Sequence, residues 1–188
     1  MTRDTDQLIV TDRLDLHLVS VPDLICLYEE PGSPRPWVDK PFTNPHRVLV
    51  DDVGPLPWRV PSVRRDPTVN RWLVRLVVLR STDEVIGYIG FHDAPDEAGM
   101  IEVGVQIVPS MRRRGYATEA LTGMWRWAVG QPGVRMLRYT VSPTNGPSVR
   151  IVEGFGFALV GRQIDEIDGP EDIYEMTAAD FAGRDGAV

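Results

Sequence analysis

One stretch of this sequence, from Ile101 to Ala128, constrains the fold more than any other. Its first part, Ile101–Val108, is apolar enough to predict a strand, which leads into Pro109, three arginines and Gly115. Beyond the glycine, apolar residues recur at intervals of three and four, which predicts a helix with one buried face. These residues are Ala117, Ala120, Leu121, Met124, Trp125 and Ala128. The chain is therefore expected to start a helix directly after a strand and a basic turn.

The turn between this strand and this helix has the chemistry of an anion-binding site. The first N–H groups of a helix lack intrahelical partners, and the helix dipole places partial positive charge there. Gly115 would let a ligand approach the backbone closely. Three consecutive arginines could also form a solvated surface turn, but their position before a helix-opening glycine favours the anion site. A pyrophosphate is the simplest ligand for such a turn.

The turn resembles the coenzyme A-binding motif of the GNAT family of acetyltransferases. That motif reads Gln/Arg-x-x-Gly-x-Gly/Ala, and Arg112, Gly115 and Ala117 occupy its fixed positions. Because the motif is short, the rest of the chain has to corroborate it.

A second family signature follows about thirty residues later in the expected order. Asn145 is followed eleven and twelve residues later by Gly156 and Phe157. The opening Thr11–Leu16 is also similar to the Thr-x-Arg-Leu-x-Leu start of many members. The resemblance covers Thr11 to about Thr177, and its Ser148 and Gly-Phe variant looks most like the ribosomal-protein N-terminal acetyltransferases (the RimJ/RimL-type branch).

The resemblance implies an α/β (α+β) architecture, the GNAT fold. This fold has a mixed, mostly antiparallel central sheet of about six to seven strands, flanked by about four helices. Apolar patterns predict strands at Leu14–Leu18, Trp72–Arg80, Glu84–His92, Ile101–Val108, Met136–Val141, Leu159–Ile164 and Ile173–Thr177. Helix-capping residues predict helices after Ser20 or Asp23 and after Asn145 or Gly146, in addition to the one after Gly115.

The length of 188 residues predicts a single acetyltransferase domain over 1–188. Nine prolines between residues 31 and 68 predict an irregular segment without long regular helices, which the resemblance also matches poorly. Residues 183–188 are expected to form a loose tail.

For the donor, the resemblance implies acetyl-CoA as a co-substrate. Backbone N–H groups of the turn would hold its pyrophosphate, and main-chain groups before Pro109 would pair with the pantetheine arm as an added strand does. Asn145 would hydrogen-bond the same arm, although it could equally be a plain helix cap, and the two roles are compatible. The predicted acetyl-CoA-binding residues are Ile107, Val108, Arg112, Arg113, Arg114, Gly115, Tyr116, Ala117, Thr118 and Asn145.

Glu102 is the candidate general base, or the residue that organises water for this role. Strand alternation places it on a polar face with Gly104 and Gln106, which would line a cleft or meet solvent. Related enzymes carry a glutamate at this place. His92, at the end of the preceding predicted strand, is the alternative base, although a lone histidine is more often structural.

Reprotonation of the coenzyme A thiolate needs a general acid. Many family members place a tyrosine seven residues after the motif asparagine, but Val152 stands there and cannot donate a proton. The ribosomal-protein branch suggests Ser148 as the substitute. Ser148 could also be an ordinary polar residue in the first turn of a helix.

The proline-rich segment contains aromatic residues that could contact the acceptor. In the GNAT family that the chain resembles, the equivalent region lines the acceptor site. The predicted substrate-binding residues are therefore Trp37, Trp58 and His92. Aromatic residues in such a segment can instead simply pack it against the core.

Composition narrows the partners and the compartment. A net charge of −7 argues against nonspecific nucleic-acid binding. The single cysteine, Cys26, excludes an intramolecular disulfide, and neither a metal site nor a signal peptide is evident. The longest apolar stretch, Trp72–Leu79, is interrupted by Arg75, which predicts no membrane span. We therefore expect a cytoplasmic protein without metal, nucleic acid or membrane partner, and a homodimer is left open.

Two functions of different classes compete. The first is an acetyl-CoA-dependent N-acetyltransferase that transfers an acetyl group directly to a primary amine, on a protein N-terminus or a small molecule. The second is a degenerate acyl-CoA-binding sensor without turnover, for which the missing tyrosine leaves room. The sequence leaves open the acceptor, the length of the acyl group and the oligomeric state.

Overall fold

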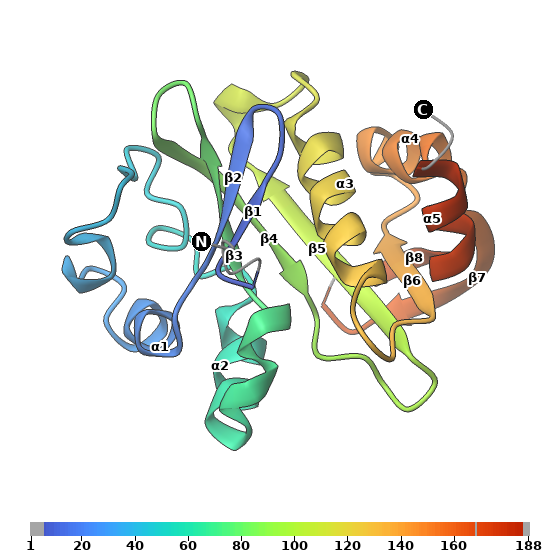
Figure 1. Cartoon of the computed structure of the whole chain (residues 1–188), viewed down its shortest axis with the longest axis horizontal. Coiled ribbons are helices and arrows are strands. Elements are labelled where there is room, and N and C mark those ends of the chain that lie inside the picture. The colour runs from blue at the N-terminus through green and yellow to red at the C-terminus, as the bar shows by residue number, and fades with distance from the viewer. Residues whose placement is uncertain (1–5, 168, 186–188) are drawn as a thin grey trace. The chain divides into compact units, whose positions relative to one another are not determined.

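The computed structural model describes residues 6–167 and 169–185, and Figure 1 shows its ribbon. These residues form eight strands: β1 (Leu8–Val10), β2 (Leu14–Leu18), β3 (Arg75–Leu79), β4 (Glu84–Phe91), β5 (Met100–Ile107), β6 (Met136–Val141), β7 (Ala158–Asp165) and β8 (Gly169–Thr177). The strand order is β1-β2-β3-β4-β5-β6-β8-β7. The strands β5 and β6 pair in parallel, while the pairs β1–β2, β2–β3, β3–β4, β6–β8 and β7–β8 are antiparallel. The mixed, mostly antiparallel sheet predicted from the sequence is thereby confirmed.

Five α-helices occur in the same described residues. They are α1 (Val21–Glu29), α2 (Leu56–Arg65), α3 (Tyr116–Val129), α4 (Gly146–Gly154) and α5 (Ala178–Asp185), with 3-10 turns at Arg35–Trp37, Pro67–Trp72 and Pro109–Met111. None of the helices in residues 6–167 and 169–185 is long and apolar enough to cross a membrane.

Contacts within the chain divide it into two compact units. The described part of the first unit comprises residues 6–94 and 105–124, and that of the second comprises residues 95–104 and 125–185 without residue 168. The strand β5 and the helix α3 each run from one unit into the other. A single domain over 1–188 therefore stays a prediction, and each unit is described by itself.

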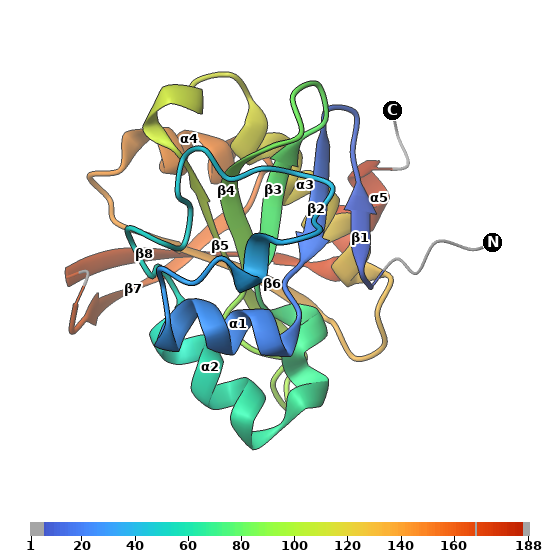
Figure 2. The same ribbon diagram turned by 90° about the vertical axis from the view of Figure 1, so that its left-hand side faces the viewer.

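In the first unit, helices pack on both faces of the strands. Leu16 of β2 is fully buried and lies on the face where Gly123 of α3 approaches it. The next residue, His17, points to the opposite face, because successive side chains of a strand alternate. There it lines a cavity together with Leu27 of α1. Figure 2 shows α1 and α2 side by side in this unit.

The helix α2 corrects the expectation that residues 31–68 are irregular throughout. It begins after Pro55 and contains Pro57 in its first turn, where the missing N–H would have no intrahelical acceptor anyway. Only Pro61 lies inside the helix, so a single backbone hydrogen bond is lost. The apolar residues Leu56, Val60 and Val63 are fully buried on one face of α2 and compensate this loss.

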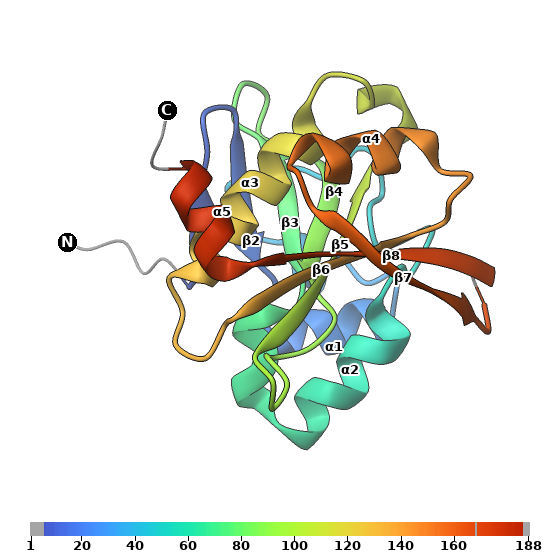
Figure 3. The same ribbon diagram turned by 90° about the vertical axis from the view of Figure 1, so that its right-hand side faces the viewer.

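The second unit is built around Trp125, whose side chain is fully buried. Its ring contacts Tyr139 of β6, Phe155 and Phe157 after α4, and Phe181 of α5, with ring centroids between 4.7 and 6.4 Å apart. Figure 3 shows α5 directly after β8.

The helix α5 corrects the expectation of a loose tail. Residues 183–185 belong to this helix, and the remaining tail residues, 186–188, lie outside the described residues. The helix is held because Phe181 is buried and Arg184 Nη1 donates to the Phe155 carbonyl at 2.9 Å.

Candidate active site

The basic turn predicted from the sequence links β5 to α3 in the first unit. Its backbone is left-handed at Arg113 (φ 60°) and at Gly115 (φ 81°). The first helical hydrogen bond runs from Glu119 N to the Gly115 carbonyl at 3.0 Å. The N–H groups of residues 115–118 therefore have no acceptor within the helix, which is the condition for binding an anion. A left-handed arginine costs on the order of 1 kcal/mol, a strain that is typical of functional turns.

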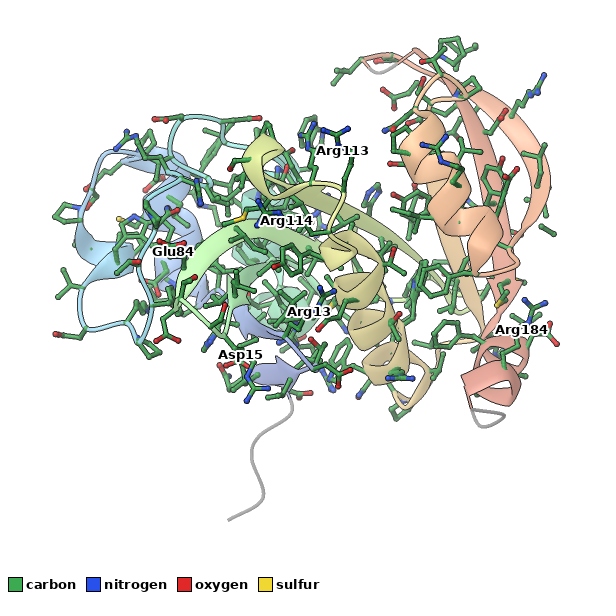
Figure 4. The ribbon with its side chains drawn as sticks, turned by 90° about the horizontal axis from the view of Figure 1, so that it is seen from above. Arg13, Asp15, Glu84, Arg113, Arg114 and Arg184 are labelled. Atoms are coloured by element: carbon green, nitrogen blue, oxygen red, sulfur yellow. The ribbon has the colours of Figure 1, made fainter. Side chains whose placement is uncertain are left out.

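The three arginines of the turn differ in what their side chains contact. Arg112 Nε donates to the Ile107 carbonyl at 2.8 Å and so ties the start of the turn to the end of β5. Arg114 Nη2 donates to the Ser110 carbonyl at 3.4 Å. Figure 4 shows Arg113 and Arg114 at this turn, and all three arginines are exposed. The turn therefore presents positive charge to solvent.

The main-chain groups expected to pair with pantetheine are partly engaged. The Val108 N–H donates to the Ile86 carbonyl at 2.9 Å, and the Val108 carbonyl accepts from Met111 N at 2.9 Å. Pairing through Val108 would thus need its carbonyl to accept a second hydrogen bond. The Ile107 carbonyl already accepts from Arg112, and both contacts with the donor stay predictions.

Arg13 packs against the first turn of α3. Its guanidinium lies 4.7 Å from the centroid of the Tyr116 ring, and Tyr116 is buried. The side chain of Tyr116 therefore packs within the protein, so that only its backbone N–H is suited to an anion at the turn. Ala117 is half-buried and Thr118 is exposed, and their roles also stay predictions.

In the second unit, Glu102 lies half-buried on β5 and its carboxylate accepts a hydrogen bond from Thr140 Oγ1 of β6. Arg138, two residues before Thr140 on β6, donates to Glu175 of β8 at 2.5 Å from its Nη2 atom. These polar side chains share one face of the strands, as the alternation of β5 predicts for Glu102. Thr140 was not identified from the sequence, because only the fold brings it to Glu102.

Asn145 and Ser148 lie at the start of α4 in the same unit. Asn145 is the N-cap of α4, and its side-chain oxygen accepts from Ser148 N at 3.4 Å. The cap that the sequence suggested is therefore confirmed. Val152, which stands where the family carries a tyrosine, is fully buried.

A tyrosine missed by the sequence reasoning contacts Ser148. The hydroxyl of Ser148 lies beside the buried phenol of Tyr139, on β6, close enough to affect its titration. Burial raises the pKa of Tyr139 above its ordinary value, and Ser148 opposes this only in part. The phenol therefore stays protonated at neutral pH. In the sequence Tyr139 is one residue of an apolar strand, and only its contact with Ser148 draws attention to it.

The two predicted catalytic residues thus lie on opposite faces of β6. Glu102 contacts Thr140 and Ser148 contacts Tyr139, and these neighbouring residues of one strand point to opposite sides. Groups placed in this way cannot share a proton directly.

A second polar pair follows Glu102 along β5, within the first unit. Gln106 Oε1 accepts from the Tyr88 hydroxyl at 2.9 Å. Burial raises the pKa of Tyr88 to about 12, so this phenol also remains protonated at neutral pH. The polar face predicted for Glu102, Gly104 and Gln106 is therefore half-buried along its length.

One of the residues predicted to bind the acceptor lines a cavity of the first unit. Trp37 lines a cavity of about 20 Å³ together with His17, Lys40 and Phe42, a volume with room for about one water molecule. Burial lowers the pKa of His17 there, with Asp15 opposing the shift. Trp58 is not among the residues that line this cavity, and its side chain is 54% exposed.

His92 is exposed just after β4. Its role as an alternative base or a substrate contact stays a prediction. Among residues 6–167 and 169–185, no group of three or more His, Cys, Asp or Glu side chains could hold a metal ion.

A family model for the GNAT acetyltransferase domain matches residues 42–158. The chain is 34% identical over 84 residues to the uncharacterized N-acetyltransferase YjdG of Bacillus subtilis, covering 45% of this chain and 50% of that protein. It is 24% identical over 154 residues to the uncharacterized N-acetyltransferase p20 of Bacillus licheniformis. This match covers 80% of this chain and 82% of p20. The match thus spans about half the length of YjdG and most of p20.

Solved structures show the same fold at lower identity. One is a chimera of the spermidine N-acetyltransferase SpeG from Vibrio cholerae with hSSAT, with 13% identity, a TM-score of 0.63 and coverage of 92% of this chain and 100% of that one. Another is RimL, a ribosomal-protein α-N-acetyltransferase in complex with coenzyme A, with 13% identity, a TM-score of 0.62 and coverage of 90% and 97%. At this identity the likeness establishes the fold alone.

Proposed function

Because the chain belongs to the GNAT acetyltransferase family, we propose that it transfers an acetyl group from acetyl-CoA directly to a primary amine. The turn that opens α3 carries this proposal. Its left-handed Arg113 and Gly115 and the helix-opening N–H groups of residues 115–118 suit the pyrophosphate of the donor. RimL, which has a similar fold, is a coenzyme A complex, and this supports the choice of donor.

The donor would be held by both charge and backbone. Arg113 and Arg114 add exposed positive charge beside the N–H groups, while Arg112 keeps the turn closed through the Ile107 carbonyl. Asn145 would contact the pantetheine arm in addition to capping α4, because an amide oxygen that caps a helix still leaves its NH₂ group free to donate.

In the transfer itself, the amine nitrogen attacks the thioester carbonyl carbon. The C–N bond forms, the C–S bond breaks, the amine loses a proton and the thiolate gains one. Glu102 takes the amine proton, directly or through a water molecule. Ser148 gives a proton to the thiolate, and the phenol of Tyr139 beside it stays protonated at neutral pH.

For the acceptor, we propose an amine whose deprotonation costs little, such as a protein N-terminus. Lifting an α-ammonium with a pKa near 7.7–8.0 to the free amine at about pH 7.4 costs under ~1 kcal/mol, whereas a lysine-like ammonium costs about 4 kcal/mol. The RimJ/RimL-like Ser148 variant agrees with such an acceptor. A polyamine is the second candidate, because the chimera containing the spermidine N-acetyltransferase SpeG has a similar fold.

The competing proposal is a sensor that binds acyl-CoA without turnover. Release of free thiol from acetyl-CoA, measured with a panel of peptide N-termini, polyamines and aminoglycosides, separates the two proposals. We expect thiol release with at least one amine and a matching acetylated product. Binding of acetyl-CoA without turnover on every amine would favour the sensor.

A further inference from the structure

We propose that Arg13, paired with Glu119, is a positioning residue that aims the Gly115 N–H group of the basic turn toward the donor pyrophosphate. The inference rests on the proposed function of this turn. It gives the Thr11–Leu16 segment, which resembles a family opening but has no role in the chemistry above, a specific task. Figure 4 shows Arg13 close to the turn that carries Arg113 and Arg114.

Arg13 contacts the turn at three points. Its Nη1 atom donates to the Arg114 carbonyl at 3.1 Å. Its Nη2 atom lies 3.3 Å from the position that a Cβ atom on Gly115 would take. Its guanidinium also stacks on the ring of Tyr116, the first residue of α3. One side chain thus contacts three consecutive residues at the start of the helix.

The contact with the Arg114 carbonyl determines the direction of the next N–H group. The Arg114 carbonyl and the Gly115 N–H belong to one planar trans peptide and therefore point in opposite directions. Because Arg13 fixes the carbonyl on its own side, the Gly115 N–H must point away from Arg13. Gly115 is left-handed and has no side chain, so its own conformational preferences would leave this peptide free to rotate.

Glu119 holds the guanidinium of Arg13 in place. Its carboxylate accepts from Arg13 Nε at 2.6 Å, from Arg13 N at 2.7 Å and from Thr11 Oγ1 at 2.6 Å. These contacts connect residues that are 106 to 108 positions apart in the chain. They fix both the backbone and the side chain of Arg13 against the first turn of α3.

The pair also solves an electrostatic problem. A carboxylate in the first turn of a helix, such as Glu119, would repel a phosphate bound at that helix N-terminus. The ion pair with Arg13 neutralises the Glu119 carboxylate, and the side chain of Glu119 is only 15% exposed. Removal of Arg13 should therefore both release the Arg114–Gly115 peptide and expose an opposing negative charge.

Arg80 provides a matched control for Arg13. Its side chain is 47% exposed against 48% for Arg13, and its Nη1 atom donates to the carbonyls of Thr11 and Asp12 at 3.2 and 3.3 Å. It thus supports the same N-terminal segment and pairs with an acid, Asp15, at 3.5 Å. Within residues 6–167 and 169–185, the side chain of Arg80 hydrogen-bonds or pairs with Thr11, Asp12 and Asp15 and not with the turn, so Arg80→Ala tests a general loss of an arginine from this region.

The first arm of the experiment needs no ligand. In protein labelled with ¹⁵N-glycine, the Gly115 amide resonance is identified by its loss in Gly115→Val. We expect Arg13→Ala to shift or broaden this resonance, whereas Arg80→Ala leaves it in place. An unchanged Gly115 resonance in folded Arg13→Ala would overturn the inference without reference to coenzyme A.

The second arm measures coenzyme A affinity by calorimetry below the unfolding temperature of each variant. We expect Arg13→Ala to weaken binding about tenfold, as loss of charge-assisted hydrogen bonds does, and Arg80→Ala to change it less than about twofold. The double variant Arg13→Ala with Glu119→Gln should recover part of the loss, because the exposed charge is removed. A merely structural role of Arg13 predicts a further loss instead.

The outcomes separate the inference from the proposed function. If Arg13→Ala binds coenzyme A like the unmodified protein while Gly115→Val does not bind it, the inference is wrong and the donor site stands. If Gly115→Val also binds coenzyme A normally, the proposed donor site itself is wrong.

Discussion

At the scale of single residues, the proposed chemistry depends on side chains that contact β6 from its two faces. Thr140 holds the Glu102 carboxylate on one face, and Tyr139 contacts Ser148 on the other. The carboxylate of Glu102 therefore has a partner that fixes its orientation, which a solvated surface residue would lack.

Replacement of Glu102 by Gln should lower kcat by roughly 10²–10⁴-fold and leave acetyl-CoA affinity nearly unchanged, because a general base acts on the amine and not on the donor. Steady-state kinetics with the best acceptor, together with calorimetry, measure both effects. Glu175→Gln is the control, since this carboxylate lies on the same face but pairs with Arg138. If the kcat of Glu102→Gln lies within twofold of that of the unmodified protein, Glu102 is not the base.

Ser148→Ala should lower kcat by at least about tenfold, and Tyr139→Phe by less, because the phenol acts through the hydroxyl. The double variant should be no slower than Ser148→Ala alone, since groups that act as one unit are not additive. Tyr174→Phe, which changes a buried phenol on the neighbouring strand β8, controls for loss of a buried hydroxyl. Equal kcat in Ser148→Ala and the unmodified protein contradicts the role.

Strand alternation and the family resemblance predict Glu102, Ser148 and Asn145, whose roles stay predictions, whereas the residues that they contact were not predictable. Glu102 and Thr140 are 38 positions apart, and Arg13 and Glu119 are 106 apart, so only the folded chain brings them together. The engaged main-chain groups of Val108 also became visible only with the turn in three dimensions.

At the scale of elements, the start of α3 combines the strained turn with the Arg13–Glu119 pair. Burial raises the pKa of Glu119, but hydrogen bonds from Thr11 and from Arg13 outweigh it, and the pKa lies below the ordinary value of 4.5. A lowered carboxylate pKa stabilises the fold above the ordinary value, and this stability is lost as the pH falls through the folded-state pKa.

The unmodified protein should therefore be more stable than Glu119→Gln at pH 7, by roughly 1–2 kcal/mol. The difference should persist down to about pH 4.5 and shrink below it. Urea denaturation at a series of pH values measures this difference, with Glu97→Gln, an exposed carboxylate, as the control. A difference that stays constant from pH 7 to pH 3 would contradict the assigned shift.

Strands and capped helices were predictable because their patterns are local. The strand Met136–Val141 was predicted with its exact bounds, and the cap of α4 was identified from Asn145. The helix α2 is not predictable from the number of prolines, because a proline in the first turn does not break a helix. The strand β1 has only three residues, too few for a periodic pattern, and α5 was hidden by its glycine and charged residues.

At the scale of the whole molecule, each compact unit has its own buried core. In the second unit Trp125 is the largest fully buried side chain, whereas Trp58 in the first unit is largely exposed. The family predicted from two short motifs is confirmed by the family model, and with it the acetyltransferase class. The acceptor was not predictable, because the motifs describe the donor side alone.

Trp125→Ala should lower the free energy of unfolding by about 3–5 kcal/mol through the cavity that it leaves. Trp58→Ala should change it by less than about 0.5 kcal/mol, since its side chain is 54% exposed. Urea denaturation compares the two variants directly. If Trp58→Ala destabilises the protein as strongly as Trp125→Ala, the assignment of the core is wrong.

The central claim, that the turn at Gly115 binds the donor pyrophosphate, is tested most directly by calorimetric titration of acetyl-CoA into two glycine variants. Gly115 and Gly133 both have left-handed backbones, with φ of 81° and 88°, so valine strains both backbones similarly, although a Cβ atom at Gly115 also meets Arg13 Nη2 at 3.3 Å and one at Gly133 meets no atom within 4 Å. Only Gly115 lies in the turn. The account predicts that Gly133→Val binds acetyl-CoA like the unmodified protein and that Gly115→Val shows no measurable binding while remaining folded. Unchanged acetyl-CoA affinity in Gly115→Val would contradict it.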